Sequence, residues 1–327
     1  MFTHLFFQHS KRFIWLAAVF VLLSQSATGL PAAASGTGIL RGSVSTSPTS
    51  DDLTAYGNFD WAIWGIANHG TSTTLYPDDN KSGGAGFIGI LTDINPCGAP
   101  LRGIGQFPIT PHTFSWTDGS VRTFATDVYA GLQHDALTTP GCGFSLTVPA
   151  FPIGRRLRVY VTTHQGVSRL TATLSDNSAV PYSDTSVPAG VNEPGLYTID
   201  YASSEVFVAP VTLTVQWVME TPTDDYNNAA IYAVTLLDAQ GITQVTIDQI
   251  TDLVDAGELT RGQGNALTKK LTHAIDSINA HSFDTAKHQL QAFIHQVNDF
   301  ISQGILSPEE GQPLIDAVNT VIDFLRV

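Results

Sequence analysis

The spacing of apolar residues changes near residue 240, and this change constrains the fold more than any other feature of the sequence. Before it, apolar and polar residues alternate, as in 156–161 and 211–217, and a repeat of two is typical of half-buried β-strands. After it, apolar residues recur at helical spacing, as in the stripe Leu314, Val318 and Val321. The sequence therefore predicts two domains, over residues 35–240 and 242–327.

The first of these domains is expected to be all-β. Short strand candidates, among them 87–91, 113–116 and 121–129, are separated by turns rich in Gly, Asp and Asn, with no helical pattern between them. Many short strands without interleaved helices favour an antiparallel sandwich or jelly roll.

The second domain is expected to be a small all-α four-helix bundle. Two capping boxes mark helix starts, one from Thr260 to Gln263 and one from Ser307 to Glu310. Pro313 is expected to interrupt the last helix, because proline lacks the N–H group that a helix interior needs.

The C-terminal segment also resembles a known family. The matching stretches are Gly257-Glu258-Leu259, Leu267-Thr268-Lys269-Lys270-Leu271 and Ala286-x-x-x-Leu290-x-Ala292-Phe293. From about Thr243 to Leu325 they resemble the FIMAH domain, a helical module at the ends of secreted bacterial proteins. The family's signature stretch is replaced here by Phe293-Ile294-His295-Gln296-Val297, so the match is to its pattern rather than its letters. The resemblance implies an accessory domain for attachment or interaction, and no site residue carries over.

The N-terminal half carries a second resemblance. It begins with Asp52-Leu53-Thr54-Ala55-Tyr56-Gly57-x-x-Asp60-Trp61-Ala62-x-Trp64-Gly65 and continues with Phe114-Ser115-Trp116-Thr117-Asp118-Gly119. These stretches are similar to a β-sandwich module of bacterial extracellular proteins whose function is not established. The resemblance implies a fold and leaves the ligand open.

The first 34 residues have the pattern of a secretory signal peptide. Lys11 and Arg12 precede an apolar run at 13–23, and small and polar residues follow up to Ala34. The run is shorter than the roughly 20 residues that span a bilayer. We expect cleavage after Ala34 and a secreted, extracellular or periplasmic protein with no membrane span once mature. An uncleaved N-terminal anchor is the alternative.

The only two cysteines, Cys97 and Cys142, lie in turns rich in Gly and Pro. In an exported protein such a pair predicts a disulfide, and two free thiols are the alternative. The chain is acidic, with 29 Asp and Glu against 15 Lys and Arg. This balance disfavours nucleic acid and anionic membranes as partners.

Two groups of residues are candidates for glycan binding. Exposed tryptophans can stack on sugar rings, so Asp60, Trp61, Trp64 and Trp116 are one candidate, with burial in the core as the alternative. The other is the basic strand on which Arg156, Arg158 and Tyr160 share a face. That face could hold an acidic glycan, or it could be an ordinary solvated strand face.

Two acidic loops are candidates for calcium, which prefers oxygen ligands. They contain Asp78 and Asp79 in one loop, and Asp224 and Asp225 in the other. The alternative is that both loops are ordinary solvated turns. No other cofactor is expected.

No catalytic signature stands out: the sequence has no G-x-S-x-G, no H-E-x-x-H and no P-loop. We therefore expect a non-catalytic binding protein whose sandwich recognises a glycan or a cell-envelope polymer. The alternatives are an extracellular polysaccharide hydrolase or lyase, and a purely structural surface or matrix protein.

Overall fold

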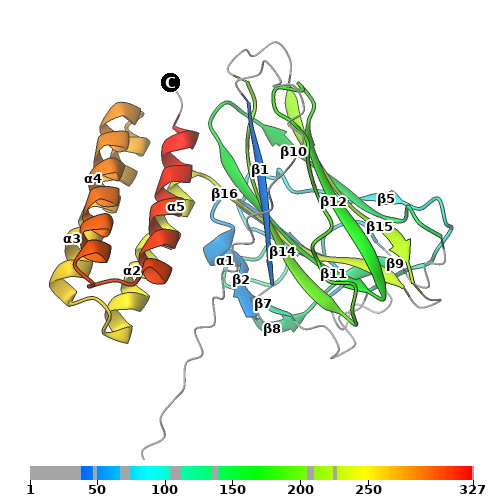
Figure 1. Ribbon diagram of the computed structural model, residues 1–327. Helices are drawn as coiled ribbons and strands as arrows, with labels where there is room; N and C mark the ends of the chain where they lie inside the picture. The colour runs from blue at the N-terminus through cyan, green and yellow to red at the C-terminus, as the bar shows by residue number, and fades with distance from the viewer. Residues whose placement is uncertain are drawn as a thin grey trace, which may run out of the picture. The chain divides into compact units, whose positions relative to one another are not determined.

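The computed structural model describes residues 38–46, 50–66, 74–103, 112–134, 139–204, 210–223 and 227–325 (Figure 1). The expected signal peptide, residues 1–34, lies outside them. Within the described ranges, no helix is both long and apolar enough to cross a membrane.

The largest sheet contains eight strands, and all its pairings are antiparallel. Its main path runs β1-β14-β11-β16-β3-β4, and β6 and β9 extend it beside β16. The strands are β1 (Ile39–Thr46), β3 (Asp60–Ile63), β4 (Asp79–Asn80), β6 (Leu101–Gly103), β9 (Leu132–His134), β11 (Arg155–His164), β14 (Glu193–Ala202) and β16 (Asn228–Leu237).

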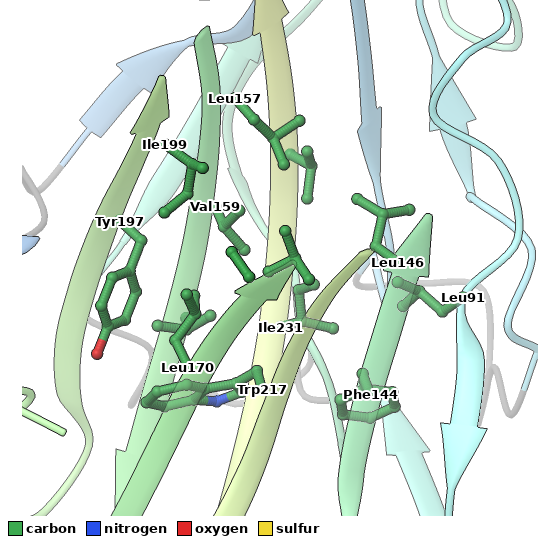
Figure 2. Close-up of a cluster of buried hydrophobic side chains, with 14 of the residues drawn as sticks. Leu91, Phe144, Leu146, Leu157, Val159, Leu170, Tyr197, Ile199, Trp217 and Ile231 are labelled. Atoms are coloured by element: carbon green, nitrogen blue, oxygen red, sulfur yellow. The ribbon is translucent and has the colours of Figure 1, made fainter. Parts of the chain in front are cut away.

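A second, five-stranded sheet packs against the first and completes an antiparallel sandwich, as the sequence predicts. Its order is β13-β12-β15-β10-β5. The strands are β5 (Thr92–Ile94), β10 (Gly143–Ala150), β12 (Gly166–Leu174), β13 (Tyr182–Asp184) and β15 (Val211–Pro222). Side chains of both sheets meet between them, among them Val159 and Ile199 from the first sheet and Leu146 and Trp217 from the second (Figure 2).

A third layer, which the sequence does not predict, covers part of the other face of the first sheet. It consists of β2 (Ser50–Asp52), α1 (Leu53–Tyr56), β7 (Thr113–Trp116) and β8 (Ala125–Tyr129). Strand β2 pairs with β7 in parallel, and β7 pairs with β8 antiparallel. Leu53, Phe114 and Trp116 of this layer form a separate core with Tyr160 and Tyr232 of the first sheet. Both faces of β11 are therefore buried.

Four helices follow: α2 (Ala239–Ala256), α3 (Arg261–Asn279), α4 (Phe283–Ser302) and α5 (Pro308–Phe324). Both predicted capping boxes are confirmed, at Thr260 and at Ser307. The expected interruption at Pro313 is wrong, because α5 continues through that residue. A proline near a helix start removes one hydrogen bond from the first turns and leaves the rest intact.

The helices bury one continuous apolar core. It includes Leu271, Leu290 and Phe293, and strand residues such as Ala202 and Leu237 belong to it as well. Because strands and helices share this core, the domain boundary near residue 240 stays a prediction.

Candidate binding sites

The tryptophan group lies in the interior. Trp61 and Trp64 are 0% exposed, and Asp60 and Trp116 are 1% exposed. A stacking platform needs a ring face that a sugar can reach, and none of these rings offers one. The expectation of a sugar platform at these residues is therefore wrong, because the third layer and the sandwich core cover them.

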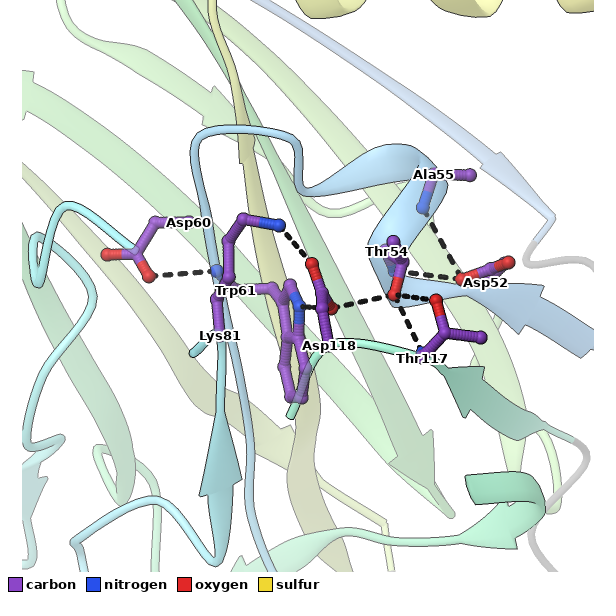
Figure 3. A network of polar contacts seen from close by, with 8 residues as sticks. All are labelled: Asp52, Thr54, Ala55, Asp60, Trp61, Lys81, Thr117 and Asp118. Atoms are coloured by element: carbon purple, nitrogen blue, oxygen red, sulfur yellow. Dashed lines mark hydrogen bonds and ion pairs between the residues drawn. The ribbon is translucent and has the colours of Figure 1, made fainter. Parts of the chain in front are cut away.

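A polar network instead holds Trp61 in place (Figure 3). Asp118 Oδ1 accepts hydrogen bonds from Thr54 Oγ1 at 2.7 Å and from Trp61 Nε1 at 2.8 Å, while its Oδ2 pairs with Lys81 Nζ. Burial alone would raise the pKa of Asp118, but the hydrogen bonds from Lys81, Thr54 and Trp61 outweigh it and lower the pKa. The ionised carboxylate of Asp118 therefore links α1, β3 and Lys81 through these contacts.

Asp60 fixes a neighbouring stretch of chain. Its Oδ2 accepts hydrogen bonds from the backbone N–H groups of Phe87 at 2.6 Å and Ile88 at 3.0 Å, and its Oδ1 accepts one from Trp61 N at 3.0 Å. Burial raises the pKa of Asp60, although these N–H groups act against the rise. The predicted strand at 87–91 is wrong, because this segment has no strand pairing and is anchored by a carboxylate instead.

The rest of the N-terminal motif also has a structural role. Asp52 caps α1 by accepting a hydrogen bond from Thr54 N at 2.8 Å. Gly57 ends that helix where a side chain has no room: a Cβ there would lie 2.6 Å from Leu53 O and 2.8 Å from Trp61 Cβ. The motif therefore builds the junction between α1 and β3.

Two of the three basic-strand residues are buried as well. Arg158 is 9% exposed and Tyr160 is 0% exposed. Arg158 Nη2 donates to Asp51 Oδ2 at 2.9 Å, and the guanidinium lies 3.8 Å from the centre of the Tyr56 ring. The Tyr160 hydroxyl donates to the same Asp51 oxygen. Both interpretations of this face, an acidic-glycan site and a solvated strand face, are wrong at these two residues, because α1 and β2 cover them.

Arg156, at the edge of the same face, is also engaged. Its Nε and Nη2 donate to the two carboxylate oxygens of Asp200 at 2.7 and 2.9 Å. Nη2 also donates to Thr320 Oγ1 on α5 at 3.2 Å. The pair with Asp200 and the bond to α5 occupy the guanidinium, whose side chain stays 22% exposed, so a ligand role for Arg156 stays a prediction.

The carboxylates of the first acidic loop are occupied by backbone groups. Asp78 Oδ2 accepts a hydrogen bond from Ile66 N at 2.9 Å. Asp79 accepts hydrogen bonds from Asn80 N, Val121 N and Arg122 N, each at 2.9 Å. In the ranges that the structure describes, no group of three or more His, Cys, Asp or Glu residues could hold a metal ion. Asp224 and Asp225 lie outside those ranges, so calcium at that loop stays a prediction.

The predicted disulfide is confirmed. Cys97 and Cys142 are bonded, with their Cα atoms 6.2 Å apart. Cys97 follows β5, and Cys142 directly precedes β10, so the bond lies beside the pairing of the end of β5 with the start of β10. Such a bond is typical of proteins in oxidising compartments.

A shallow hollow lies on the outer face of the five-stranded sheet, the face turned away from the sandwich core. Its volume is about 340 Å³. It is lined by Arg169 and Thr171 of β12, by Gln216, Val218, Met219 and Glu220 of β15, and by Pro140 and Gly141 of the segment before β10.

A bidentate ion pair lies in this hollow. Arg169 Nε donates to Glu220 Oε1 at 3.0 Å, and Nη2 lies 2.6 and 2.8 Å from the two carboxylate oxygens. Arg169 Nη1 donates to Ser183 Oγ on β13 at 2.9 Å. The side chains of Arg169 and Glu220 are 40% and 41% exposed, so solvent reaches both. Sequence reasoning missed this site, although the alternation of β12 and β15 predicts which residues point away from the core.

Three solved structures are similar to parts of the chain. The first, TmCBM61 in complex with β-1,4-galactotriose, has a TM-score of 0.29 and 12% identity, and the match covers 45% of this chain and 86% of that one. The second is the arabinose-bound MgGH51 α-L-arabinofuranosidase, with a TM-score of 0.31, 7% identity and coverage of 54% of this chain and 26% of that one.

The third is the enzymatically active domain of bacteriophage CBA120 tailspike protein 4, with a TM-score of 0.25 and 12% identity. The match covers 45% of this chain and 19% of that one. The chain thus spans about a quarter or less of the second and third structures. At these TM-scores the likeness carries no functional argument.

The curated proteins contain no match to the sequence. Residues 244–323 match the model of the FIMAH domain, which confirms the resemblance of the helical C-terminal region to that family.

Proposed function

We propose that the β-sandwich binds a glycan on the outer face of its five-stranded sheet, centred on the hollow around Arg169. The observation that carries this proposal is the grouping of Arg169, Gln216 and Glu220 around one solvent-open hollow of about 340 Å³. These side chains come from neighbouring strands, so the sheet itself holds them in position.

The chemistry of these groups suits sugar hydroxyls, each of which both donates and accepts hydrogen bonds. The guanidinium of Arg169 supplies donors, the carboxylate of Glu220 supplies acceptors, and the amide of Gln216 supplies both. The ion pair with Glu220 and the bond to Ser183 hold Arg169 in place before any ligand arrives. Pre-organised groups lose less conformational freedom when they bind.

The same lining favours binding over hydrolysis. Glycoside hydrolysis by the usual mechanism needs two carboxyl groups on either side of the scissile bond. Among the residues that line the hollow, Glu220 is the only one with a carboxylate, and both of its oxygens contact Arg169. We therefore propose a binding role and not a hydrolase.

The proposal also places the protein outside the cytosol. The Cys97–Cys142 bond supports this location. Cleavage of a signal peptide after Ala34 stays part of the proposal, and N-terminal sequencing of the exported protein, with Ser35 expected first, tests it. We further propose that the FIMAH-matching helices act as an accessory interaction domain.

The experiment is a binding screen of the full mature chain against soluble and insoluble polysaccharides and cell-wall polymers. It compares wild type with Arg169→Ala and with a control, Arg41→Ala, which removes an exposed arginine from its pair with Asp323 and does not belong to the lining of the hollow. We expect at least one polymer to bind, Arg169→Ala to lower its affinity about tenfold, and Arg41→Ala to leave it unchanged. The proposal is wrong if no polymer binds, or if Arg169→Ala binds as wild type does.

A further inference from the structure

We infer that the ligand is an extended, uncharged polysaccharide chain that runs from the hollow along rows of hydroxyl-bearing side chains on the same sheet face. This inference rests on the proposed function and specifies its substrate class. It follows from the register of the strands, from the charges on the face and from the chemistry of its side chains.

The register aligns three threonines in one row across the sheet. Thr147 of β10 is paired with Thr214 of β15, and Thr214 is paired with Thr173 of β12. The hydroxyls of Thr147 and Thr214 lie 3.3 Å apart. Their neighbours along the strands, such as Leu146 and Val215, point into the sandwich core, so these threonines point outward.

A second row joins this one to the hollow. Gln216 is paired with Thr171 on one side and with Ser145 on the other, and Ser145 is paired with Thr92 of β5. Ser145 is only 8% exposed, so Gln216 and Thr171 are the members of this row that a ligand would contact. Gln216 and Thr171 also line the hollow. Thr214 lies two residues before Gln216 on β15, which is about 6.6–6.8 Å along a strand. The threonine row therefore continues the hollow on one surface.

The charge on this surface indicates an uncharged ligand. Among the outward-facing residues of the two rows and the hollow, only Arg169 and Glu220 are charged, and they neutralise each other as a bidentate pair. An acidic glycan would require unpaired basic groups, since charge-assisted bonds give most of such affinity. The face supplies hydroxyls and an amide instead.

The absence of aromatic rings from these rows determines how the ligand is held. Without stacking, recognition depends on hydrogen bonds, each worth only about 0.5–1.5 kcal/mol net in water. Useful affinity then requires many such bonds, and so several sugar units bound in line. We infer that affinity rises with the length of the oligosaccharide until the rows are filled.

The test uses neutral oligosaccharides of increasing length, prepared from the polymer that binds in the screen, and a carboxylate-bearing polysaccharide of similar length. The variants are Thr147→Val and Thr214→Val, which remove a hydroxyl and keep the branched shape that strands favour. The matched control is Thr126→Val, an exposed threonine on β8 outside this face. Calorimetric affinities are measured at low and high salt, with thermal unfolding to confirm that each variant folds.

We expect each row variant to weaken binding of the longest oligosaccharide about five- to tenfold, while binding of the shortest one that binds stays unchanged. We also expect Thr126→Val to have no effect, affinity to be insensitive to salt, and the acidic polymer to bind more weakly. The inference is overturned if the row variants bind long oligosaccharides as wild type does, or if the acidic polymer binds better. If either result occurs while Arg169→Ala still weakens binding, only this inference is wrong and the proposed function holds. If no polymer binds in the screen, both the inference and the proposed function are wrong.

Discussion

Arg158 and Asp51 form a buried ion pair that joins β11 of the first sheet to β2 of the third layer. Arg158 Nη2 lies 2.9 Å from Asp51 Oδ2, and the side chains are 11% and 5% exposed. Burial raises the pKa of Asp51, although the charge of Arg158 acts against the rise. The pair therefore depends on both partners, because either charge alone would lie in a medium that solvates it poorly.

Arg158→Leu is expected to destabilise the protein strongly, by about 3–5 kcal/mol, because it leaves Asp51 buried without its partner. Urea unfolding of the variant measures this. Arg41→Leu is the control, since its exposed pair with Asp323 is worth at most about 1 kcal/mol. Equal losses for the two variants would contradict the role of burial. The double variant Asp51→Leu/Arg158→Leu should lose less than the sum of its single changes.

Asp118→Asn is expected to lower stability at neutral pH and to have less effect in acid. The folded protein holds the pKa of Asp118 below its ordinary value of about 3.9. A carboxyl whose pKa is lowered on folding adds stability above its unfolded pKa, and that stability is lost as the pH falls through the folded pKa.

Unfolding free energies of Asp118→Asn and wild type, measured from pH 7 down to pH 3, check this prediction. Their difference should shrink as the pH falls. Asp299→Asn, an exposed position on α4, serves as the control. A difference that stays constant over the whole range would show that the charge of Asp118 contributes nothing.

Gly57→Ala is expected to destabilise the protein by about 1–3 kcal/mol, the usual cost of forcing atoms into a packed region. The new Cβ would meet Leu53 O and Trp61 Cβ, neither of which is the end of a flexible chain. Gly89→Ala is the matched control, because nothing lies within 4 Å of a Cβ placed there. Thermal unfolding of both variants gives the comparison, and a Gly57→Ala protein as stable as Gly89→Ala would refute it.

Replacing both cysteines by serine is expected to lower stability by about 3–4 kcal/mol, because the bond closes a loop with a sequence separation of 45. Unfolding with and without a reducing agent measures this. Reduced wild type should match the Cys97→Ser/Cys142→Ser variant. A wild type whose stability is insensitive to reduction would show that the bond adds no stability.

Local patterns in the sequence predicted much of this fold. Alternation in 211–217 and 156–161 placed β15 and β11 in a sandwich, and the spacing of capping residues located the starts of α3 and α5. These features depend on neighbours within a few positions, so a single sequence carries them. The cysteine pair was predictable for another reason, because only one intramolecular pairing exists.

The third layer was not predictable in this way. It depends on β2 pairing in parallel with β7, which joins Asp51 to Phe114. Alternation correctly placed Arg158 and Tyr160 on one face of β11, but it could not show what covers that face. Because α1 and β2 are distant from β11 in the sequence, the alternation alone indicates a solvent-exposed face where the structure has a second core.

The hollow was missed for a similar reason. Arg169 and Glu220 are 51 positions apart in the sequence, and only the pairing of β12 with β15 brings them together. Spacing along the chain gives no partner for Glu220, so the sequence alone does not indicate the pair. The aromatic motif lies in the interior, whereas the described residues that line the hollow and form the two rows include no aromatic residue.

The carboxylate of Asp60 has a consequence for protein engineering. By accepting hydrogen bonds from Phe87 N and Ile88 N, it pins the stretch before β5 from inside the core. Just beyond the pinned residues, Gly89 faces open space and Ile90 is 50% exposed. A foreign peptide inserted between Gly89 and Ile90 would therefore extend into solvent from a backbone that Asp60 holds in place, so this position suits the insertion of peptides into the sandwich.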